Sequence, residues 1–165
     1  MAYRRPLLPG GMVAPTRLQG KGFVLRPLTI HDVVKDYDAV MSSVDRLVGH
    51  MDPVSDWPRG LSLEANLVDL AWHQREFTMG HSFAYTVVRP DDARCLGCAY
   101  VYPSDRAGYA AMAFWWVRTS EAETGLDDRL GRAFRQWLEA DWPLRPIAFP
   151  GRDIGWDRWR TLPAI

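Results

Sequence analysis

The second half of the chain alternates short apolar runs with turn-forming residues. Residues 83–88 (FAYTVV), 95–101 (CLGCAYV) and 110–117 (AAMAFWWV) are rich in β-branched and aromatic side chains, as in strands. A helical segment then runs to Pro143, and another strand is predicted at 146–149. The helix has an apolar stripe that comprises Leu126, Leu130, Ala133, Phe134, Trp137 and Leu138. This order predicts an α+β fold: a mixed sheet, with an antiparallel meander and a βαβ crossover, flanked by helices.

The first half of the chain predicts one strand and two helices. The strand covers 23–26, and Thr29 with Asp32 forms a capping box for the first helix. The predicted buried face of that helix comprises Ile30, Val33, Val34, Tyr37, Val40, Met41, Val44 and Leu47. The second helix begins at Ser62 and ends at Gly80. Its predicted face comprises Leu63, Leu67, Leu70, Gln74 and Phe77.

Composition narrows the class of protein. The 165 residues are enough for one domain with its own core, and we expect residues 1–20, rich in Pro and Gly, to form an extended arm on a single domain at 21–165. A net charge of zero gives no electrostatic footprint for nucleic acid or an anionic membrane. No segment reads as a signal peptide or membrane span. The two cysteines fit a reducing cytoplasm, where we expect the protein to reside.

Cys95 and Cys98 have the C-x-x-C spacing of a zinc or redox pair. A tetrahedral zinc site needs four ligands, and the sequence offers no second pair. Three residues apart in an extended strand, the two side chains are expected on opposite faces of the sheet. We therefore interpret both cysteines as small apolar strand residues and predict no metal site.

His73 and Glu76 lie one turn apart on the second predicted helix. They are candidates for a general base and its orienting carboxylate, and the alternative is an ordinary surface pair. The loop 49–60 brings further polar groups, His50, Asp52 and Asp56, which fit either ligand contact or turn chemistry. Of the eight tryptophans, three lie in irregular segments and are candidates for a ligand wall or a protein interface: Trp57, Trp156 and Trp159.

The order of elements resembles the GNAT N-acetyltransferase superfamily across about residues 22–150. FVLRPL at 23–28 with Asp32 is similar to that superfamily's opening strand and helix start. LGCAY at 96–100 resembles its third strand, and Trp116-Val117 the end of its fourth. The resemblance implies an acetyl-CoA cleft in which the fourth strand's backbone pairs with pantetheine and a glycine loop cradles the pyrophosphate at a helix N-terminus. The implied cofactor-binding residues are Trp116, Val117, Gly125 and Leu126.

The sequence departs from the superfamily's phosphate loop, R/Q-x-x-G-x-G/A. Gly125 matches, but Ala122 stands at the cationic position and Asp127 at the last glycine. Glu121, Glu123 and Asp128 add negative charge where a dianion would lie. The fourth strand has no acid to serve as a base, and the usual fourth helix and closing strands do not follow the fifth strand.

Two functions are therefore open. The first is acetyl transfer from acetyl-CoA to an amine of a small molecule or peptide, with His73 assisted by Glu76 as the base. The second is a non-catalytic GNAT-like domain with a degenerate acidic cleft, acting in binding or assembly. Because the strand at 146–149 would be an open sheet edge, we also expect a homodimer in which the tail with Trp156 and Trp159 takes part.

Overall fold

The computed structural model of this chain describes residues 5–165. Its sheet has six strands in the order of the sequence. They are β1 (Leu18–Gly20), β2 (Phe23–Pro27), β3 (Phe83–Val88), β4 (Cys95–Pro103), β5 (Ala111–Val117) and β6 (Ile147–Ala148). β1 to β5 pair antiparallel, and β6 pairs parallel to β5, so the predicted α+β mixed sheet is confirmed.

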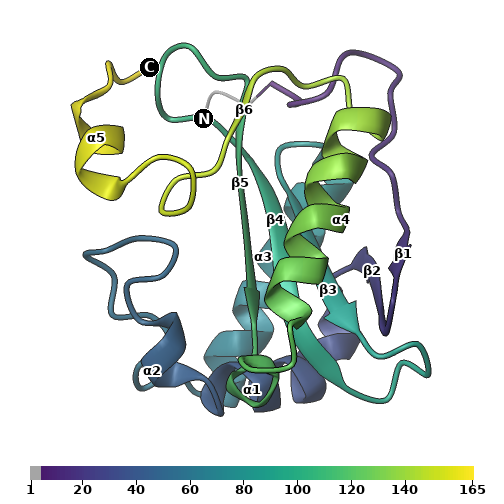
Figure 1. Cartoon of the computed structure of the whole chain (residues 1–165). Helices are drawn as coiled ribbons and strands as arrows, with labels where there is room; N and C mark the ends of the chain where they lie inside the picture. Colours follow the sequence, from purple (N-terminus) through teal and green to yellow (C-terminus); the bar gives the residue numbers. More distant parts are fainter. Residues whose placement is uncertain (1–4) are drawn as a thin grey trace.

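The helices cover both faces of the sheet (Figure 1). They are η1 (Ile30–Asp32), α1 (Val33–Met41), α2 (Val44–Leu47), α3 (Leu63–Met79), η2 (Thr119–Glu121), α4 (Leu126–Asp141) and α5 (Trp156–Thr161). α4 lies on one face, while α1 and α3 lie on the other. The apolar core is therefore divided into two clusters, one on each side of the sheet. Residues on β5 alternate between them, which explains why its sequence is apolar almost throughout.

The predicted stripe of α4 is confirmed. Leu126, Leu130, Phe134, Trp137 and Leu138 are all buried, and Ala133 packs against the same cluster. The helix begins after Gly125, whose φ of 78° is left-handed and suits glycine. Thr124 accepts a hydrogen bond from the Leu126 amide through its hydroxyl, at 3.3 Å. The chain then leaves the helix at Trp142 and turns back toward β6.

The first helix differs from its prediction in two ways. The capping box of Thr29 and Asp32 is present, but the segment breaks at Ser42 and Ser43 into α1 and α2. Val34 is 70% exposed and Ile30 is also exposed, so the prediction of a buried position is wrong for both. The buried face includes Asp36 instead, 3% exposed and one turn from Val40.

The buried face of the second helix agrees with the prediction at Leu70 and Phe77 and differs from it at two other positions. Ser62 caps α3 through its hydroxyl, which accepts from the Ala65 amide, and Gly80 ends the helix with a φ of 72°. Leu63 and Leu67 are exposed, which corrects the prediction for both. The side of α3 that faces the sheet is defined by Asn66, Leu70, His73 and Phe77.

The N-terminal segment is part of the fold. β1 adds a sixth strand beside β2, and Leu8 and Ala14 are buried in the core cluster under α4. Tyr85 donates a hydrogen bond to the Pro15 carbonyl at 2.7 Å, which ties the segment to β3. The part of the predicted arm at residues 1–4 lies outside the described residues.

The expectation that Cys95 and Cys98 face opposite sides of the sheet is wrong. The register between β3 and β4 shifts at Val87 and Val88, where Val88 pairs with Cys95 and Val87 with Gly97. Leu96 is the extra residue of this β-bulge, and it packs into the cluster under α4. The bulge places both cysteines in the opposite cluster, beside α1.

Candidate functional site

The outer edge of β5 is the candidate site. β6 pairs with β5 only at Ala111 and Met112, and the chain after β6 turns away. Beyond Met112, β5 continues to Val117 with no strand on that side among residues 5–165. Because β6 ends at Ala148, the second half of β5 has an outer edge that no strand of the described residues covers.

Side chains of the same molecule bind the backbone along this edge. The Trp115 carbonyl accepts hydrogen bonds from His50 Nε2 at 2.9 Å and from Arg152 Nη2 at 3.0 Å. The Val117 carbonyl accepts one from Arg46 Nε at 3.0 Å. A carbonyl can only accept, so His50 carries its proton on Nε2 in this arrangement. Its burial also lowers the pKa of His50, which favours the neutral ring.

Arg152 is held in the cleft by two further contacts. Its guanidinium donates two hydrogen bonds to the carboxylate of Asp127, both at 3.0 Å. It also lies over the Trp115 ring, with the guanidinium carbon 3.6 Å from the ring centroid. Arg152 thus connects the segment after β6 with the first turn of α4, beside the outer edge of β5.

Several hydrogen-bond donors of the loop between β5 and α4 are engaged within the protein. Arg118 is 3% exposed and donates to Asp38, Ser42 and the Cys95 carbonyl. The Thr119 amide donates to the Ser43 hydroxyl at 2.9 Å. Further amides of this loop form turns within it, namely those of Glu121, Ala122 and Thr124. These bonds leave the loop tied to the α1–α2 junction and reduce the number of N–H groups free to bind an anion.

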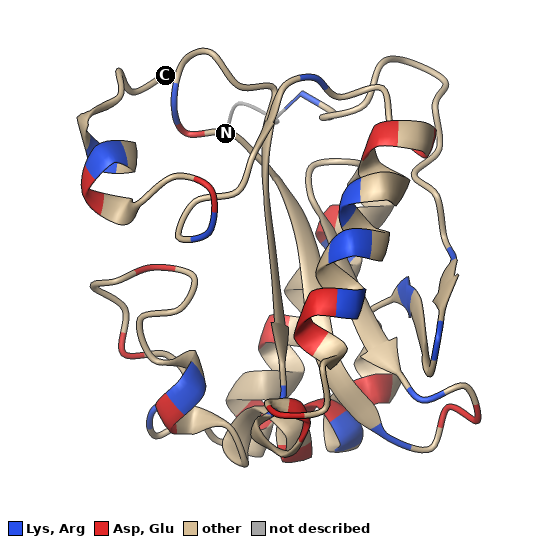
Figure 2. Cartoon of the chain, in the orientation of Figure 1, with Lys and Arg blue, Asp and Glu red and all other residues tan. Residues whose placement is uncertain are grey.

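Acidic residues gather at the start of α4. Figure 2 shows acids at its N-terminal end and arginines further along the helix. Asp127 and Asp128 lie in its first turn, where the helix dipole favours negative charge. They complement the helix in the way a bound phosphate would, and Arg152 is the cation that offsets Asp127.

The predicted cofactor-binding residues lie at this cleft through their backbone. Trp116 is 1% exposed, and its indole donates to the Tyr100 hydroxyl on the α1 side of the sheet. Val117 presents its carbonyl to Arg46, Gly125 forms the turn before α4, and Leu126 is buried in the core. Their binding role stays a prediction.

The predicted catalytic pair lies on a different part of the molecule, on the inner side of α3. Glu76 is buried, and its carboxylate contacts Arg75 at 2.7 Å and His81 at 3.3 Å. The His73 ring lies between Trp72 and Tyr100, at centroid distances of 5.0 and 5.7 Å. Burial lowers the pKa of His73 to about 4, so its ring is neutral at pH 7. A catalytic role for the two residues stays a prediction.

The β-bulge creates a cluster of buried polar groups that sequence reasoning missed. Asp36, Cys95 and Cys98 place ligand-type atoms within 4.8 Å of one another. The Cys98 thiol donates to Asp36 at 3.4 Å, and the Cys95 thiol donates to the Gly97 carbonyl at 3.3 Å. Burial raises the pKa of Cys98, so the thiol stays protonated. The two thiols act here as hydrogen-bond donors.

The loop 49–60 and the C-terminal tail face each other beside β5 (Figure 1). Between them lies a cavity of about 310 Å³, lined by Met51, Asp52, Phe114, Trp156 and Trp159 among others. Trp156 stacks on Phe114, with ring centroids 6.2 Å apart. Two of the three tryptophans singled out from the sequence thus line one cavity, while Trp57 lines another, between α1 and α3.

The cleft residues Arg46, His50 and Arg152 could not be recognised as a group from their spacing. They lie on α2, on the following loop and after β6, and only the fold brings them to one strand edge. Asp36 did carry a signal. It lies three residues after Val33 and four before Val40, so an acid stands on the apolar face of the first helix.

Comparison with known proteins identifies the fold. No protein-family model and no curated protein matches the sequence. Solved structures do match. One is described as a putative ribosomal-protein-serine acetyltransferase from Vibrio cholerae, with 11% identity, a TM-score of 0.60, and 78% of this chain and 70% of that chain covered. A putative GNAT-family acetyltransferase from Bordetella pertussis has 14% identity, a TM-score of 0.58, and coverage of 76% and 73%.

A third match is Mycobacterium smegmatis RimJ in complex with CoA-disulfide. It is 14% identical with a TM-score of 0.61, and the alignment covers 81% of this chain and 64% of RimJ. These comparisons show that the chain has the fold of the GNAT acetyltransferases, as the resemblance in its sequence implied. At this identity the likeness concerns the fold, and function has to be argued from the site. No helix in the described part of the chain has the length and apolar character to cross a membrane.

Proposed function

We propose that this chain is a non-catalytic binding domain of GNAT fold, with a cofactor cleft that its own side chains keep closed. The observation that carries the proposal is the pairing of the Trp115 and Val117 carbonyls with Arg46, His50 and Arg152. In a GNAT enzyme, this strand edge would bind the pantetheine arm. Here a ligand would have to replace three internal hydrogen bonds before it gained its own.

The phosphate end of the cleft supports the same conclusion. Arg152 forms a salt bridge with Asp127, and Arg118 forms one with Asp38. The remaining acids of the loop and first turn, Glu121, Glu123 and Asp128, would repel a pyrophosphate. The acids of this region therefore oppose a pyrophosphate, and the two arginines beside them already have carboxylate partners.

The test is a calorimetric titration of the full chain with acetyl-CoA near physiological salt. We expect no saturable heat at concentrations up to about 1 mM, which corresponds to a binding free energy weaker than about −4 kcal/mol. Sub-micromolar affinity would contradict the proposal. Ionic strength must be fixed, because screening changes how strongly the cleft acids act on a charged ligand.

An acetyltransferase is the second candidate, and the outer edge of β5, unpaired with a strand beyond Met112 among the described residues, favours it. Solved GNAT proteins share this fold. In one of these structures, RimJ is bound to CoA-disulfide. If Arg152 left the cleft, the edge of β5 would be open to acetyl-CoA. An amine would then attack the thioester carbonyl, the CoA thiolate would leave, and a base would take the amine's proton. His73 with Glu76 is the predicted base, although a pKa of about 4 makes that imidazole a weak one.

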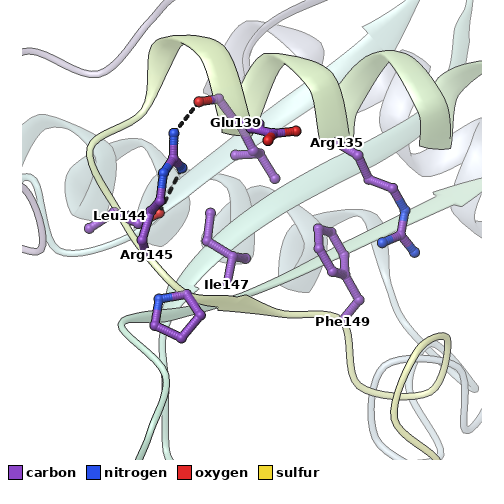
Figure 3. Close-up of a pocket in the computed structure, with 8 residues that line it drawn as sticks. Arg135, Glu139, Leu144, Arg145, Ile147 and Phe149 are labelled. Carbon is purple, nitrogen blue, oxygen red and sulfur yellow. Dashed lines mark hydrogen bonds between the residues drawn. The ribbon is translucent and has the colours of Figure 1, made fainter.

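We further infer that a second copy of this chain covers the outer edge of β6. β6 is the last strand of the sheet, and a cavity of about 380 Å³ lies between it and α4 (Figure 3). Ile147 and Phe149 line this cavity together with Arg135 and Arg145. The tail does not cover this edge: Pro163 and Ile165 bond to Ala107 and Asp105 of the loop after β4. An open strand edge is a surface on which strands of two copies pair. Cytoplasmic location stays a prediction from the two free cysteines.

A further inference from the structure

The segment between β6 and α5, residues 150–155, forms a short turn that is named the strap. Its backbone hydrogen bonds are local. The Gly151 amide donates to the Ile154 carbonyl at 2.8 Å. The Arg152 amide donates to the Phe149 carbonyl, directly before the strap, at 3.1 Å. Because these bonds do not reach other elements of the fold, the strap can change position without breaking them.

Two ion pairs hold the strap on α4, and they run in opposite directions. Arg152 of the strap donates two hydrogen bonds to Asp127 of α4, both at 3.0 Å. Arg135 of α4 donates two hydrogen bonds to Asp153 of the strap, both at 2.7 Å. Bidentate pairs of this kind fix orientation as well as distance. The strap thus gives α4 one cation and one anion, and it receives one of each in return.

The docked strap covers Trp115 of β5, which is 3% exposed. The Arg152 guanidinium lies over the Trp115 ring, 3.6 Å from its centroid, and Nη2 donates to the Trp115 carbonyl at 3.0 Å. Arg135 lies over the same ring at 5.2 Å and over the Phe149 ring at 4.0 Å (Figure 3). His50 binds the Trp115 carbonyl from a different loop. The strap therefore supplies one of the two contacts of this carbonyl.

The strap is fixed at both ends by packing, but its middle is held by partly exposed charges. Phe149, before the strap, is 9% exposed and belongs to the core under α4. Trp156, after it, stacks on Phe114. The four charged side chains of the two ion pairs are 24–52% exposed. Each such pair favours the docked position by roughly 1.5-fold to fivefold. The ends can therefore stay in place while the middle leaves α4.

We propose that the strap is a reversible cover on the outer edge of β5, which opens as a unit when its two ion pairs with α4 break. Opening would uncover the face of the Trp115 ring and free one acceptor position of its carbonyl. Because both ion pairs are accessible to solvent, salt should weaken them and favour the open position. The inference rests on the proposed closed cleft, and it adds that one movable segment controls part of the closure.

The test compares NMR spectra of the isotope-labelled full chain with no ligand added. The variants are Asp127→Asn, Asp153→Asn and the two combined, since asparagine keeps the shape of the side chain but removes its charge. The amides of the strap and the Trp115 indole should change together, partly in each single variant and most in the double one. The ratio of open to closed strap should rise up to about fivefold in each single variant and about tenfold or more in the double one.

A salt titration of the parent provides a second measurement that needs no variant. Raising NaCl from about 0.05 M to about 0.5 M should move the same signals in the same direction as the substitutions do. Asp128→Asn is the matched control, because it removes an equal charge from the first turn of α4. Asp128 forms no salt bridge within residues 5–165, so the strap and the Trp115 indole should not respond.

Three results would overturn the proposal. They are an unchanged Trp115 indole in the double variant and at high salt, an equal response in Asp128→Asn, and strap amides that respond while Trp115 does not. Because the experiment uses no acetyl-CoA, its failure leaves the proposed function standing. Binding of acetyl-CoA to the parent would instead contradict the proposed function and leave the result on the strap intact.

Discussion

Arg152 and Asp127 form a two-pronged ion pair, with both hydrogen bonds at 3.0 Å, between the segment after β6 and the first turn of α4. The pair lies at the segment where the sequence departs from the implied GNAT phosphate loop. In the alignment that the sequence resemblance implies, Asp127 takes the position of that loop's last glycine, and the structure shows Arg152 as its partner. The substitution of an acid for glycine and the presence of Arg152 in the cleft are thus two parts of one arrangement.

Ala122→Arg combined with Asp127→Gly tests this arrangement. The change restores the cationic and glycine positions of the loop and deprives Arg152 of its partner. With Arg152 released and an arginine added in place of Ala122, the affinity for acetyl-CoA should rise about tenfold or more over the parent. Calorimetry measures this change.

The matched control is Ala122→Arg with Asp128→Gly, which has the same change in charge but leaves the Arg152 pair intact. We expect little gain in that variant. Equal gains in the two would mean that net charge alone governs binding, and no gain in either, with both folded, would contradict the alignment at Gly125.

Arg152→Met should affect the cleft more than the stability of the fold. Both partners of the ion pair are about one-quarter exposed, so its contribution is expected to be roughly 1 kcal/mol or less. Methionine keeps apolar contact with the Trp115 ring but cannot donate to the Trp115 carbonyl. Urea unfolding should show a loss of about 1–2 kcal/mol in total. A loss large enough to unfold the protein would mean that Arg152 is a core element of the fold.

Gly97→Ala should be severely destabilising. A Cβ at this position would lie 2.0 Å from the Trp116 carbonyl oxygen and 3.0 Å from the Val117 Cα, and both are backbone atoms of β5. Strand pairing would have to separate, at a cost of about 3 kcal/mol or more. Gly155→Ala is the control, since nothing lies within 4 Å of its Cβ. Comparable thermal midpoints for the two variants would contradict the close approach of β4 and β5.

Asp36 should make the unfolding free energy depend on pH. Burial raises the pKa of its carboxyl from 3.8 to about 6. The folded state therefore holds a proton that the unfolded chain has released, and this stabilisation, complete below pH 4, is lost as the pH rises through about 6. Two pKa units correspond to at most about 3 kcal/mol.

Neighbouring groups also titrate, so the readout is the difference between the parent and Asp36→Asn across pH 4 to 7. Those near Asp36 are Asp32 on its own segment, Asp69 and His73 on α3, and Cys98 and Tyr100 on β4. His73 acts in the opposite direction, because its lowered pKa adds stability as the pH rises. The parent should lose stability relative to Asp36→Asn as the pH increases. A constant difference between the two curves would contradict the burial of an uncompensated carboxylate.

Ile147→Lys should convert the expected dimer to a monomer. The side chain lies in the groove beside β6, where a lysine would block pairing with a second strand. Val68→Lys on the exposed side of α3 is the control for an added charge. Light scattering should give a dimer for the parent and the control only. A monomeric parent over the accessible concentration range would refute pairing at this edge.

Local patterns predicted most of the sheet, because β-branched runs and turn residues determine where strands begin and end. The stripe of α4 was equally clear, since one of its faces is wholly apolar. The alternation of side chains along a strand gave the wrong face of the sheet where a β-bulge interrupts the strand. The bulge at Leu96 moved Cys95 to the face of Cys98, and Gly97, a glycine inside a predicted strand, was its only local signal. β1 was missed because three residues of mixed polarity do not show a period.

The candidate site was less predictable than the fold. His50 was a candidate from its loop, but its partner is a backbone carbonyl on β5, and any sequence offers such a carbonyl. No sequence pattern linked Arg46 with Arg152, because 106 positions separate them in the chain. The acid-rich loop was visible in the sequence, and its pairing with Arg152 required the three-dimensional arrangement.

The measurement that tests the closed cleft most directly is an NMR titration of the isotope-labelled parent with acetyl-CoA. The amides of Trp115, Val117, Thr119 and Leu126 report on both ends of the presumed cofactor site. With the carbonyls bound to Arg46, His50 and Arg152, these signals should stay unchanged at a large excess of acetyl-CoA. Saturable shifts of the same signals at one equivalent of acetyl-CoA would contradict the account and establish an open cofactor cleft.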